Sequence, residues 1–361
     1  MPPVYVPILK GKEGEYAALE ELSTAVRDSI LPLIEVARVP FDYVNERPAK
    51  TIDEHVAGVA DRLRRCWENR ALYLDLSPLV SDEQPESGIR AARRVLRNCQ
   101  DSSIVAIPVI ATSSPEGYLA AAREHNVECG YGVCIRLTSD DFDENGDTEP
   151  HVEVDELVDR VGLTSLSDTD LILDLADIGR DLGRATLVAR AVIGQTPRST
   201  EWRRLVVAAA SFPENLSDVA AATTTSLPRV EWDLWQRLRR RRGLRNDAIF
   251  GDYAIAHPVP TELDPRTMRM SASIRYTTPD NWLIVKGRNL RQHGFDQYFE
   301  LAQTLVGLPE FSGEGFSWGD GFIARCARGS AGPGNATTWR KVGTNHHLTL
   351  VARALSISDE S

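Results

Sequence analysis

The stretches ALYLDLS (residues 71–77) and DTDLILDLA (residues 168–176) decide the fold of this chain. In both, leucines occupy every second position, and Tyr73, Asp75 and Asp174 fall between them. Side chains alternate across a strand, so the leucines take one face and the residues between them take the other. The pattern predicts two buried strands whose leucines face helices and whose aspartates face the opposite way, close to the end of each strand.

Other stretches resemble these two and bring the number of strand candidates to eight: Val4–Lys10, Ile30–Val36, Ala71–Ser77, Ile104–Ala111, Gly130–Leu137, Asp168–Ala176, Leu205–Ser211 and Ala248–Tyr253. Stretches with helical spacing of apolar residues lie between them, such as Glu13–Asp28 and Thr51–Trp67. This alternation predicts an α/β fold, a (β/α)8 TIM-like barrel. A doubly wound open sheet is the main alternative, but the first βα turn, Lys10–Gly14, lacks the three-glycine dinucleotide fingerprint.

The pattern changes after the eighth strand. Ser271–Val285 predicts a β-hairpin inserted at this point, and Gly294–Val306 predicts the helix that closes the barrel. His347–Ala352 alternates in the manner of a strand. We therefore predict a barrel over residues 1–310 and a C-terminal appendage over residues 311–361, packed on the barrel.

Composition limits the class of protein. The chain has 361 residues, of which 42% are hydrophobic and 26% charged, as in globular proteins. It has no run of eighteen apolar residues and no signal-peptide pattern, so we expect a cytoplasmic protein without membrane contact. Five cysteines without a CxxC pair disfavour a disulfide framework and a structural zinc site. The net charge of −11 disfavours loose binding to nucleic acid, but a local basic pocket is compatible with it, so nucleic acid is not excluded as a partner.

Four stretches along the chain resemble the phage beta-protein family, which is found in phages and in bacterial defence-type gene neighbourhoods: YVPILKGKEGEYAALEEL (5–22), ILPLIEV (30–36), LYLDLSPL (72–79) and GNATTWRKVGTNHHLTLV (334–351). The resemblance covers nearly the whole chain. It implies a barrel-like fold and a phage-related or anti-phage setting. It implies no catalytic residues.

Charged residues occupy the position that we predict to be the last inward-facing one of six strands: Lys10, Glu35, Asp75, Arg136, Asp174 and Asp252. In parallel barrels the active site lies at the carboxyl ends of the strands. Burying an unpaired charge costs several kcal/mol, so these groups must be paired, hydrated or bound to a ligand.

Two interpretations of this cluster remain open. In the first, Glu35, Asp75 and Asp174 hold a divalent cation, Mg²⁺ or Mn²⁺, and act with Asp252 as catalytic acids and bases. Lys10 and Arg136 then bind an anionic group such as phosphate. In the second, the charges form a layer of salt bridges that fills the barrel, for example between Arg136 and Asp174.

The tail segment around residues 339–347 holds a second group of reactive side chains, Arg340, Asn345, His346 and His347. On a strand, adjacent histidines face opposite sides, so one could serve as a base or metal ligand while the other packs or is solvated. We treat these four residues as candidate ligand-binding residues, together with Lys286 of the predicted hairpin.

Two functional hypotheses from different classes follow. The first is a barrel enzyme that acts on a small anionic or nucleotide-like ligand, for example as a metal-dependent phosphodiesterase or hydrolase. The second is a non-catalytic sensor or binding subunit that recognises a phage component or a partner protein from the same locus. The long C-terminal appendage and the absence of any complete catalytic signature support the second hypothesis. The chain has no P-loop, no GxSxG elbow and no HExxH motif, which removes three common enzyme classes in their usual forms.

Overall fold

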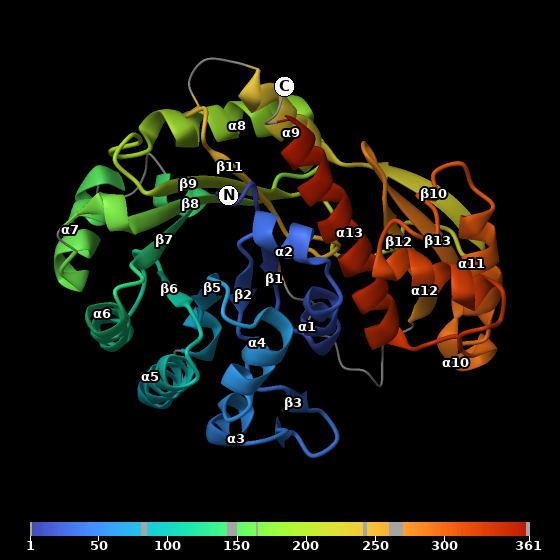
Figure 1. Ribbon diagram of the computed structural model, residues 1–361, viewed down its shortest axis with the longest axis horizontal. Helices are drawn as coiled ribbons and strands as arrows, with labels where there is room; N and C mark the ends of the chain where they lie inside the picture. Colours follow the sequence, from blue (N-terminus) through green and yellow to red (C-terminus); the bar gives the residue numbers. More distant parts are fainter. Residues whose placement is uncertain are drawn as a thin grey trace.

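A computed structural model of the chain describes residues 2–80, 85–142, 150–163, 165–240, 244–259 and 270–358. Its centre is a closed barrel of eight parallel strands in the order β1-β11-β9-β8-β7-β6-β5-β2 (Figure 1). Their bounds are β1 Tyr5–Leu9, β2 Leu33–Glu35, β5 Leu72–Asp75, β6 Ala106–Ile110, β7 Val133–Thr138, β8 Thr169–Asp177, β9 Arg204–Ala210 and β11 Ile249–Asp252. The predicted (β/α)8 barrel and all eight of its strands are confirmed.

The alternation predicted from the leucines is also confirmed. Leu72, Leu74 and Leu173 belong to the large apolar cluster between the strands and the helices. Tyr73 and Ile172, which alternate with them, belong to a separate cluster inside the barrel. The last inward residues of these strands therefore reach the carboxyl end of the barrel, which we call the mouth.

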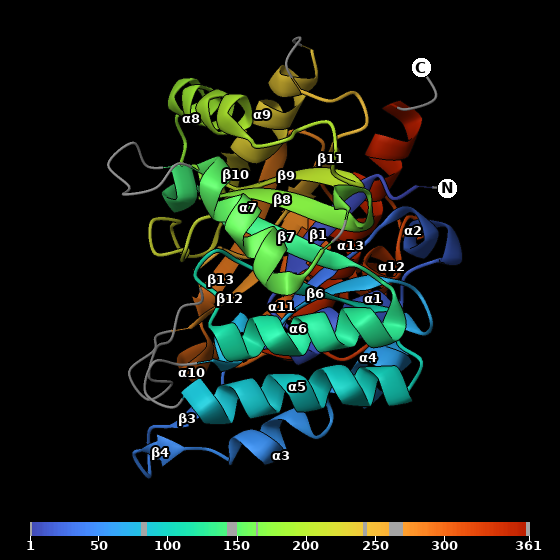
Figure 2. The same ribbon diagram turned by 90° about the vertical axis from the view of Figure 1, so that its left-hand side faces the viewer.

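Helices surround the barrel: α1 Glu13–Glu20, α2 Thr24–Ser29, α3 Ile52–Val56, α4 Val59–Trp67, α5 Pro85–Asp101, α6 Glu116–Cys129, α7 Pro150–Val161, α8 Leu182–Gln195 and α9 Val230–Arg239. Figure 2 shows α5 and α6 lying side by side along the outside of the strands. The stretches Glu13–Asp28 and Thr51–Trp67 each form two short helices rather than one. A short two-stranded sheet, β3 Phe41–Asp42 with β4 Arg47–Pro48, follows β2.

The segment after β11 forms an additional unit beside the barrel (Figure 1). The predicted hairpin is present as β12 Ser271–Thr277 and β13 Asn281–Asn289. A third strand, β10 Thr223–Pro228, precedes α9 in the chain and pairs with β13, which was not predicted. Helices α10 Leu290–His293, α11 Gln297–Val306 and α12 Trp318–Ala327 complete the unit, which has its own apolar cluster.

The strand predicted at His347–Ala352 is wrong, because these residues lie within α13, a helix of 23 residues over Ala336–Ser358. In Figure 1, α13 lies between the barrel and the additional unit. Leu348 and Val351 pack into the barrel cluster, whereas Trp339 and Val342 pack into the cluster of the additional unit. A helix buried on two sides has no continuous polar face, which explains why its sequence resembles a strand.

The predicted division at residues 310 and 311 stays a prediction, and the packing of α13 shows that the barrel core also draws on residues beyond 311. Within the described ranges, no helix is long and apolar enough to cross a membrane.

Candidate functional site

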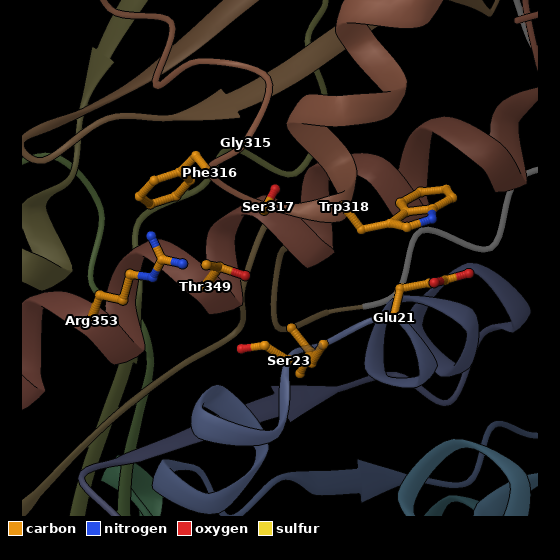
Figure 3. A pocket seen from close by; sticks show the side chains of 9 residues that line it. Glu21, Ser23, Gly315, Phe316, Ser317, Trp318, Thr349 and Arg353 are labelled. Atoms are coloured by element: carbon orange, nitrogen blue, oxygen red, sulfur yellow. The ribbon is translucent and has the colours of Figure 1, made fainter.

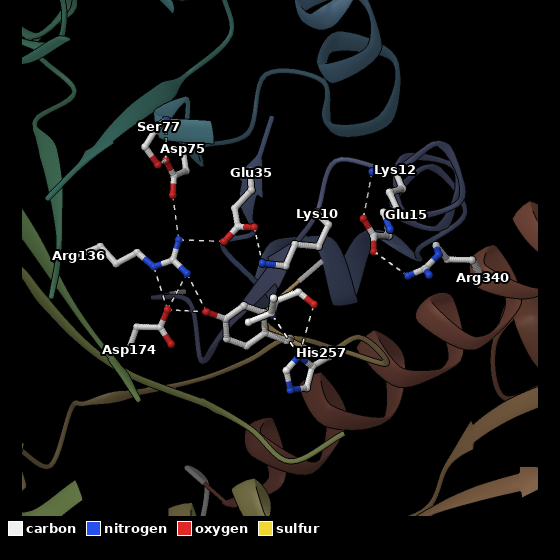
Figure 4. A network of polar contacts seen from close by, with 12 residues as sticks. Lys10, Lys12, Glu15, Glu35, Asp75, Ser77, Arg136, Asp174, His257 and Arg340 are labelled. Atoms are coloured by element: carbon white, nitrogen blue, oxygen red, sulfur yellow. Dashed lines mark hydrogen bonds and ion pairs between the residues drawn. The ribbon is translucent and has the colours of Figure 1, made fainter. Parts of the chain in front are cut away.

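The guanidinium of Arg136 is the centre of the barrel mouth (Figure 4). Its Nη1 donates to Glu35 Oε1 at 2.9 Å and to Asp75 Oδ2 at 2.8 Å. Its Nε and Nη2 donate to Asp174 Oδ2 at 2.9 and 2.6 Å, and Nη2 also donates to the hydroxyl of Tyr253 at 2.7 Å. A guanidinium has five N–H donors, and all five have an acceptor here.

Each acceptor of this network comes from a different strand end. Glu35 and Asp75 are the last residues of the neighbouring strands β2 and β5, where they lie in register. Asp174 lies on β8, and its Oδ1 accepts the backbone N–H of Ala176 at 2.9 Å. Ala176 has a positive φ of 51°, so the chain turns sharply there and holds the carboxylate at the mouth.

Lys10 and Tyr253 extend the network to the first and last strands of the barrel. Lys10 Nζ donates to Glu35 Oε2 at 2.5 Å and lies 4.8 Å from the centre of the Tyr253 ring. The Tyr253 hydroxyl in turn donates to Asp174 Oδ2 at 2.5 Å. Lys10, Glu35, Asp75 and Asp174 are between 2% and 8% exposed, so these charges lie in a largely buried layer.

The charges and the burial at the mouth fix the protonation states of Arg136 and Tyr253. Burial alone would lower the pKa of Arg136, but the negative charges of Asp174, Glu35 and Asp75 outweigh it and raise that pKa well above its usual value. Burial, followed by the charge of Asp174, raises the pKa of the Tyr253 hydroxyl well above its usual value. Tyr253 therefore remains a neutral donor, and Arg136 remains a cation.

A divalent cation does not fit this arrangement of side chains. The three carboxylates predicted as metal ligands, Glu35, Asp75 and Asp174, all turn toward the Arg136 guanidinium. Among the residues that the structure describes, no group of three or more His, Cys, Asp or Glu could hold a metal ion. A cation could use the three carboxylates together only if Arg136 moved away.

Asp252 was predicted at the mouth, and the structure corrects this. Phe250 and Ala254 of the same segment belong to the outer apolar cluster, whereas Ile249 and Tyr253 face the barrel interior. Asp252 thus lies on the outer face of β11, and Tyr253 takes the inward position. We chose Asp252 because it is charged. Both faces of this short strand carry apolar residues, so the alternation of side chains did not show which face points into the barrel.

On the outer face, Asp252 belongs to a second buried network. Its Oδ1 accepts the hydroxyl of Tyr5 at 2.5 Å, and its Oδ2 is 2.9 Å from His347 Nε2. His347 Nδ1 lies 2.9 Å from Thr277 Oγ1 on β12. Burial raises the pKa of Asp252, but His347 and Arg229 outweigh it and lower that pKa below its usual value. This network joins the barrel, α13 and the additional unit, and it is closed to solvent.

His346 and Asn345 also join elements within the core. His346 Nδ1 is 2.8 Å from Asp320 Oδ2, and its Nε2 is 2.7 Å from the backbone oxygen of Thr277. Asn345 donates to the backbone oxygen of Ala18 at 3.1 Å and accepts the backbone N–H of Gly319 at 3.0 Å. Adjacent residues on a helix point about 100° apart, so the two histidines serve two different networks.

Lys286 and Arg340, the remaining predicted ligand-binding residues, lie apart from the Arg136 network. Lys286 Nζ donates to the backbone oxygens of Leu216 and Val219, both at 2.6 Å. Arg340 Nη1 lies 3.3 Å from Glu15 Oε1, beside Lys12 (Figure 4). The structure therefore brings together Lys10, Glu35, Asp75, Arg136 and Asp174, and it places the other six predicted residues elsewhere.

Two further cations near the mouth were not predicted, Lys12 and Arg275. Lys12 follows β1 after a turn at Gly11, whose φ is 60°. A side chain at Gly11 would place its Cβ 2.5 Å from the backbone oxygen of Glu35, so this tight turn requires glycine. Arg275 lies on β12, and only the strand alternation within the predicted hairpin could have indicated which way it faces.

A pocket of about 280 Å³ lies on the outside of the barrel, between α1, α2, α12 and α13 (Figure 3). The Arg353 guanidinium lies 4.6 Å from the centre of the Phe316 ring. Lys341 pairs with Glu21 at 2.9 Å and lies 3.9 Å from the centre of the Trp318 ring. The ion pair neutralises the one carboxylate of the lining, and the pocket uses none of the strand-end residues.

The fold and the mouth define the class of protein: a parallel (β/α)8 barrel whose strand ends hold a buried network of charged side chains. Within this class, the chain belongs to the Beta protein family, whose sequence model matches residues 5–353. This confirms the resemblance seen in the sequence. The chain is 24% identical over 357 residues to Protein beta of Enterobacteria phage P4, which covers 95% of this chain and 91% of the phage protein.

The solved structures that resemble this chain include a putative phosphonomutase from Burkholderia cenocepacia J2315. It is 15% identical, with a TM-score of 0.33, and the match covers 70% of this chain and 85% of that one. The membership in the Beta protein family makes this a phage-related protein.

Proposed function

We propose that this phage-related protein is a cytoplasmic recognition subunit that binds a small phosphate-bearing ligand, such as a nucleotide, at the mouth of its barrel. Its role would lie in phage infection or in the defence of bacteria against it. In this view the ligand reports a state of infection, and a partner protein from the same locus responds to it. The charged layer at the strand ends forms the floor of the binding site.

The saturation of Arg136 is the observation that carries this proposal. All five of its N–H donors are used by Glu35, Asp75, Asp174 and Tyr253. A carboxylate held by a guanidinium is a poor base and a poor metal ligand, because both roles need its lone pairs free. The arrangement supports a rigid, preorganised surface for recognition over one built for acid–base or metal chemistry.

Ligand that remains bound during purification provides the test. Small molecules released from the denatured protein are identified by mass spectrometry, for the wild type and for Lys10→Gln. Lys10 lies at the edge of the floor with 8% exposure, so loss of its charge should strongly reduce the amount of a bound anion. Lys341→Gln removes a cation that pairs with Glu21 outside the mouth, and it should retain the ligand.

The proposal fails if no phosphorus-containing molecule accompanies the wild type, or if Lys10→Gln retains as much of it as Lys341→Gln does. Circular dichroism of both variants establishes that they are folded before the amounts are compared.

A metal-dependent phosphodiesterase or hydrolase is the second candidate. One observation favours it: three carboxylates from three strand ends, Glu35, Asp75 and Asp174, surround the same guanidinium. Mg²⁺ and Mn²⁺ prefer such oxygen ligands. The candidate requires that Arg136 leaves this position when the cation arrives, and manganese titration distinguishes the two functions.

A further inference from the structure

Arg275, at the mouth of the barrel, forms no ion pair with a carboxylate in the described part of the chain. Its Nη1 donates to the backbone oxygen of Ile255 at 2.9 Å, and its guanidinium lies 4.8 Å from the centre of the Phe212 ring. Ile255 follows β11 and Phe212 follows β9, so the side chain lies over the ends of the seventh and eighth barrel strands in chain order. In parallel barrels, phosphate groups are frequently bound at the loops that follow these strands.

Two further cations come to the same place from other elements. Lys12 lies directly before α1, and Arg340 lies on α13, where its Cβ packs against Gly14 of α1. The backbone oxygen of Arg275 in turn packs against Gly343, one turn further along α13. The close contacts of α13 with both α1 and β12 thus bring Lys12, Arg275 and Arg340 into one cluster, which we call the basic cluster.

Among the described residues, the basic cluster carries more positive than negative charge. Glu15 accepts from Arg340 Nη1 at 3.3 Å, and its other oxygen accepts the backbone N–H of Lys12 at 3.1 Å. Across the described part of the chain, no carboxylate lies within ion-pair distance of the Lys12 or Arg275 side chain. Within the ranges that the structure describes, three cations therefore share one carboxylate.

The pKa values of Arg275 and Lys12 are both lowered, by burial and by the neighbouring positive charge. Burial and then the charge of Arg340 lower the pKa of Arg275 to about 10. The same two causes, in the same order, lower the pKa of Lys12. The charged forms of Arg275 and Lys12 are thus destabilised by their surroundings, and an anion placed beside them would relieve this. Lys12 is exposed, and Arg275 and Arg340 are partly exposed, so an anion can reach them.

We propose that Lys12, Arg275 and Arg340 form a subsite for the phosphate group of the ligand, at the side of the mouth next to Lys10. This inference rests on the proposed function and names the part of the site that reads the phosphate. Arg136 has no free donor for this task, whereas Arg275 has one acceptor for its five donors in the described structure. A guanidinium with free donors binds two phosphate oxygens at once, and a lysine adds a mobile charge.

Calorimetric titration of the full-length protein with inorganic phosphate tests the subsite, at an ionic strength held constant with sodium chloride. The wild type should bind phosphate saturably. Lys12→Gln and Arg275→Gln should each weaken the binding about tenfold or more, because each removes a charge-assisted hydrogen bond. Arg64→Gln removes an exposed cation that pairs with Asp61 on α4, and it should bind phosphate as the wild type does.

Lys12 is exposed, so Lys12→Gln should fold even if Arg275→Gln does not. The subsite is refuted if the wild type shows no saturable binding, or if Lys12→Gln and a folded Arg275→Gln bind phosphate as tightly as Arg64→Gln. The experiment can refute this subsite without refuting the proposed function. A co-purifying ligand lost in Lys10→Gln, with phosphate affinity unchanged in Lys12→Gln, would keep the recognition function and remove only this subsite.

Discussion

At the scale of single residues, strand parity was the most informative property of the sequence. It placed Asp75 and Asp174 correctly, because leucines on both sides of each aspartate mark the outer face. It failed at Asp252, where Ile249 and Phe250 are both apolar and Gly251 has no side chain to mark a face. Charge alone then suggested the wrong residue, and Tyr253 was missed although it bonds to both Arg136 and Asp174.

Pairing within the mouth could not be predicted from the sequence. Both interpretations of the cluster used the same residues, and the difference lies in whether the Arg136 side chain reaches across to Glu35 and Asp75. Those contacts join β7 to β2 and β5, and β6 separates β7 from β5 in the barrel. Such a reach depends on the barrel radius and on side-chain conformation, which no local pattern encodes.

Replacement of Arg136 provides a prediction at this scale. The wild type should not bind Mn²⁺ measurably, because the guanidinium fills the space between the three carboxylates and neutralises them. Arg136→Gln leaves those carboxylates close together without their cation, so this variant should gain Mn²⁺ affinity and be stabilised by the metal. Isothermal titration and melting temperatures with and without Mn²⁺ measure both effects.

The double variant Arg136→Gln with Asp75→Asn is the control, since it removes one carboxylate and should lose the gained affinity. Tight binding of Mn²⁺ by the wild type, abolished by Asp75→Asn, would instead favour the metal-dependent hydrolase.

At the scale of elements, helix α13 is the main difference between prediction and structure. Alternating polar and apolar residues over His347–Ala352 are typical of a strand, but they also occur in a helix that is buried on two faces. Several of its buried polar side chains have specific partners on other elements, as Asn345 has on α1 and α12. The candidate site residues of the tail therefore join elements of the fold.

Gly343 tests how closely α13 packs on its neighbours. Alanine in place of glycine normally stabilises a helix interior by about 1 kcal/mol. At Gly343 a Cβ would lie 2.7 Å from Ile255 Cδ1 and 2.8 Å from the backbone oxygen of Arg275, which cannot rotate away. We expect Gly343→Ala to lower the free energy of unfolding by about 1 to 3 kcal/mol, as overpacking does.

Gly194→Ala in α8 is the matched control, because a Cβ there would meet nothing within 4 Å. It should raise the free energy of unfolding by a few tenths of a kcal/mol up to about 1 kcal/mol. Urea titration of both variants measures the difference, and equal stabilisation by the two alanines would contradict the close contact.

At the scale of the whole molecule, the barrel could be predicted from the sequence, but the packing of α13 on the barrel and the pairing of β10 with β13 could not. The βα alternation is local, so each strand and most helices could be recognised from short windows. Helix α13 packs beside α1 and contacts β1, but it begins only at Ala336, after the rest of the additional unit in the chain. The pairing of β10 with β13 likewise joins segments on either side of α9 and β11. Long-range contacts of this kind have no signature in a short stretch of sequence.

Buried histidines should make the stability of the whole molecule depend on pH. Burial lowers the pKa of His125, and it lowers that of His347 despite the opposing charge of Asp252. In the unfolded chain a histidine takes up its proton near pH 6.5, and in the folded protein these two do so only at lower pH. Below about pH 6.5 the unfolded state therefore binds more protons, so the free energy of unfolding should fall as the pH falls.

The variant His125→Gln isolates one of these contributions. His125 Nε2 lies 3.0 Å from the backbone oxygen of Ala106, and a glutamine amide can donate to the same oxygen without titrating. Buried Glu231 acts in the opposite direction, because burial raises its pKa, but it is unchanged in the variant. We expect the melting temperature to fall less between about pH 7 and pH 5.5 in His125→Gln than in the wild type. The control is His293→Gln, which replaces an exposed histidine and should leave the pH dependence of the melting temperature as in the wild type. If the melting temperature of His125→Gln falls as steeply as that of the wild type, His125 takes up its proton as readily in the folded protein as in the unfolded chain.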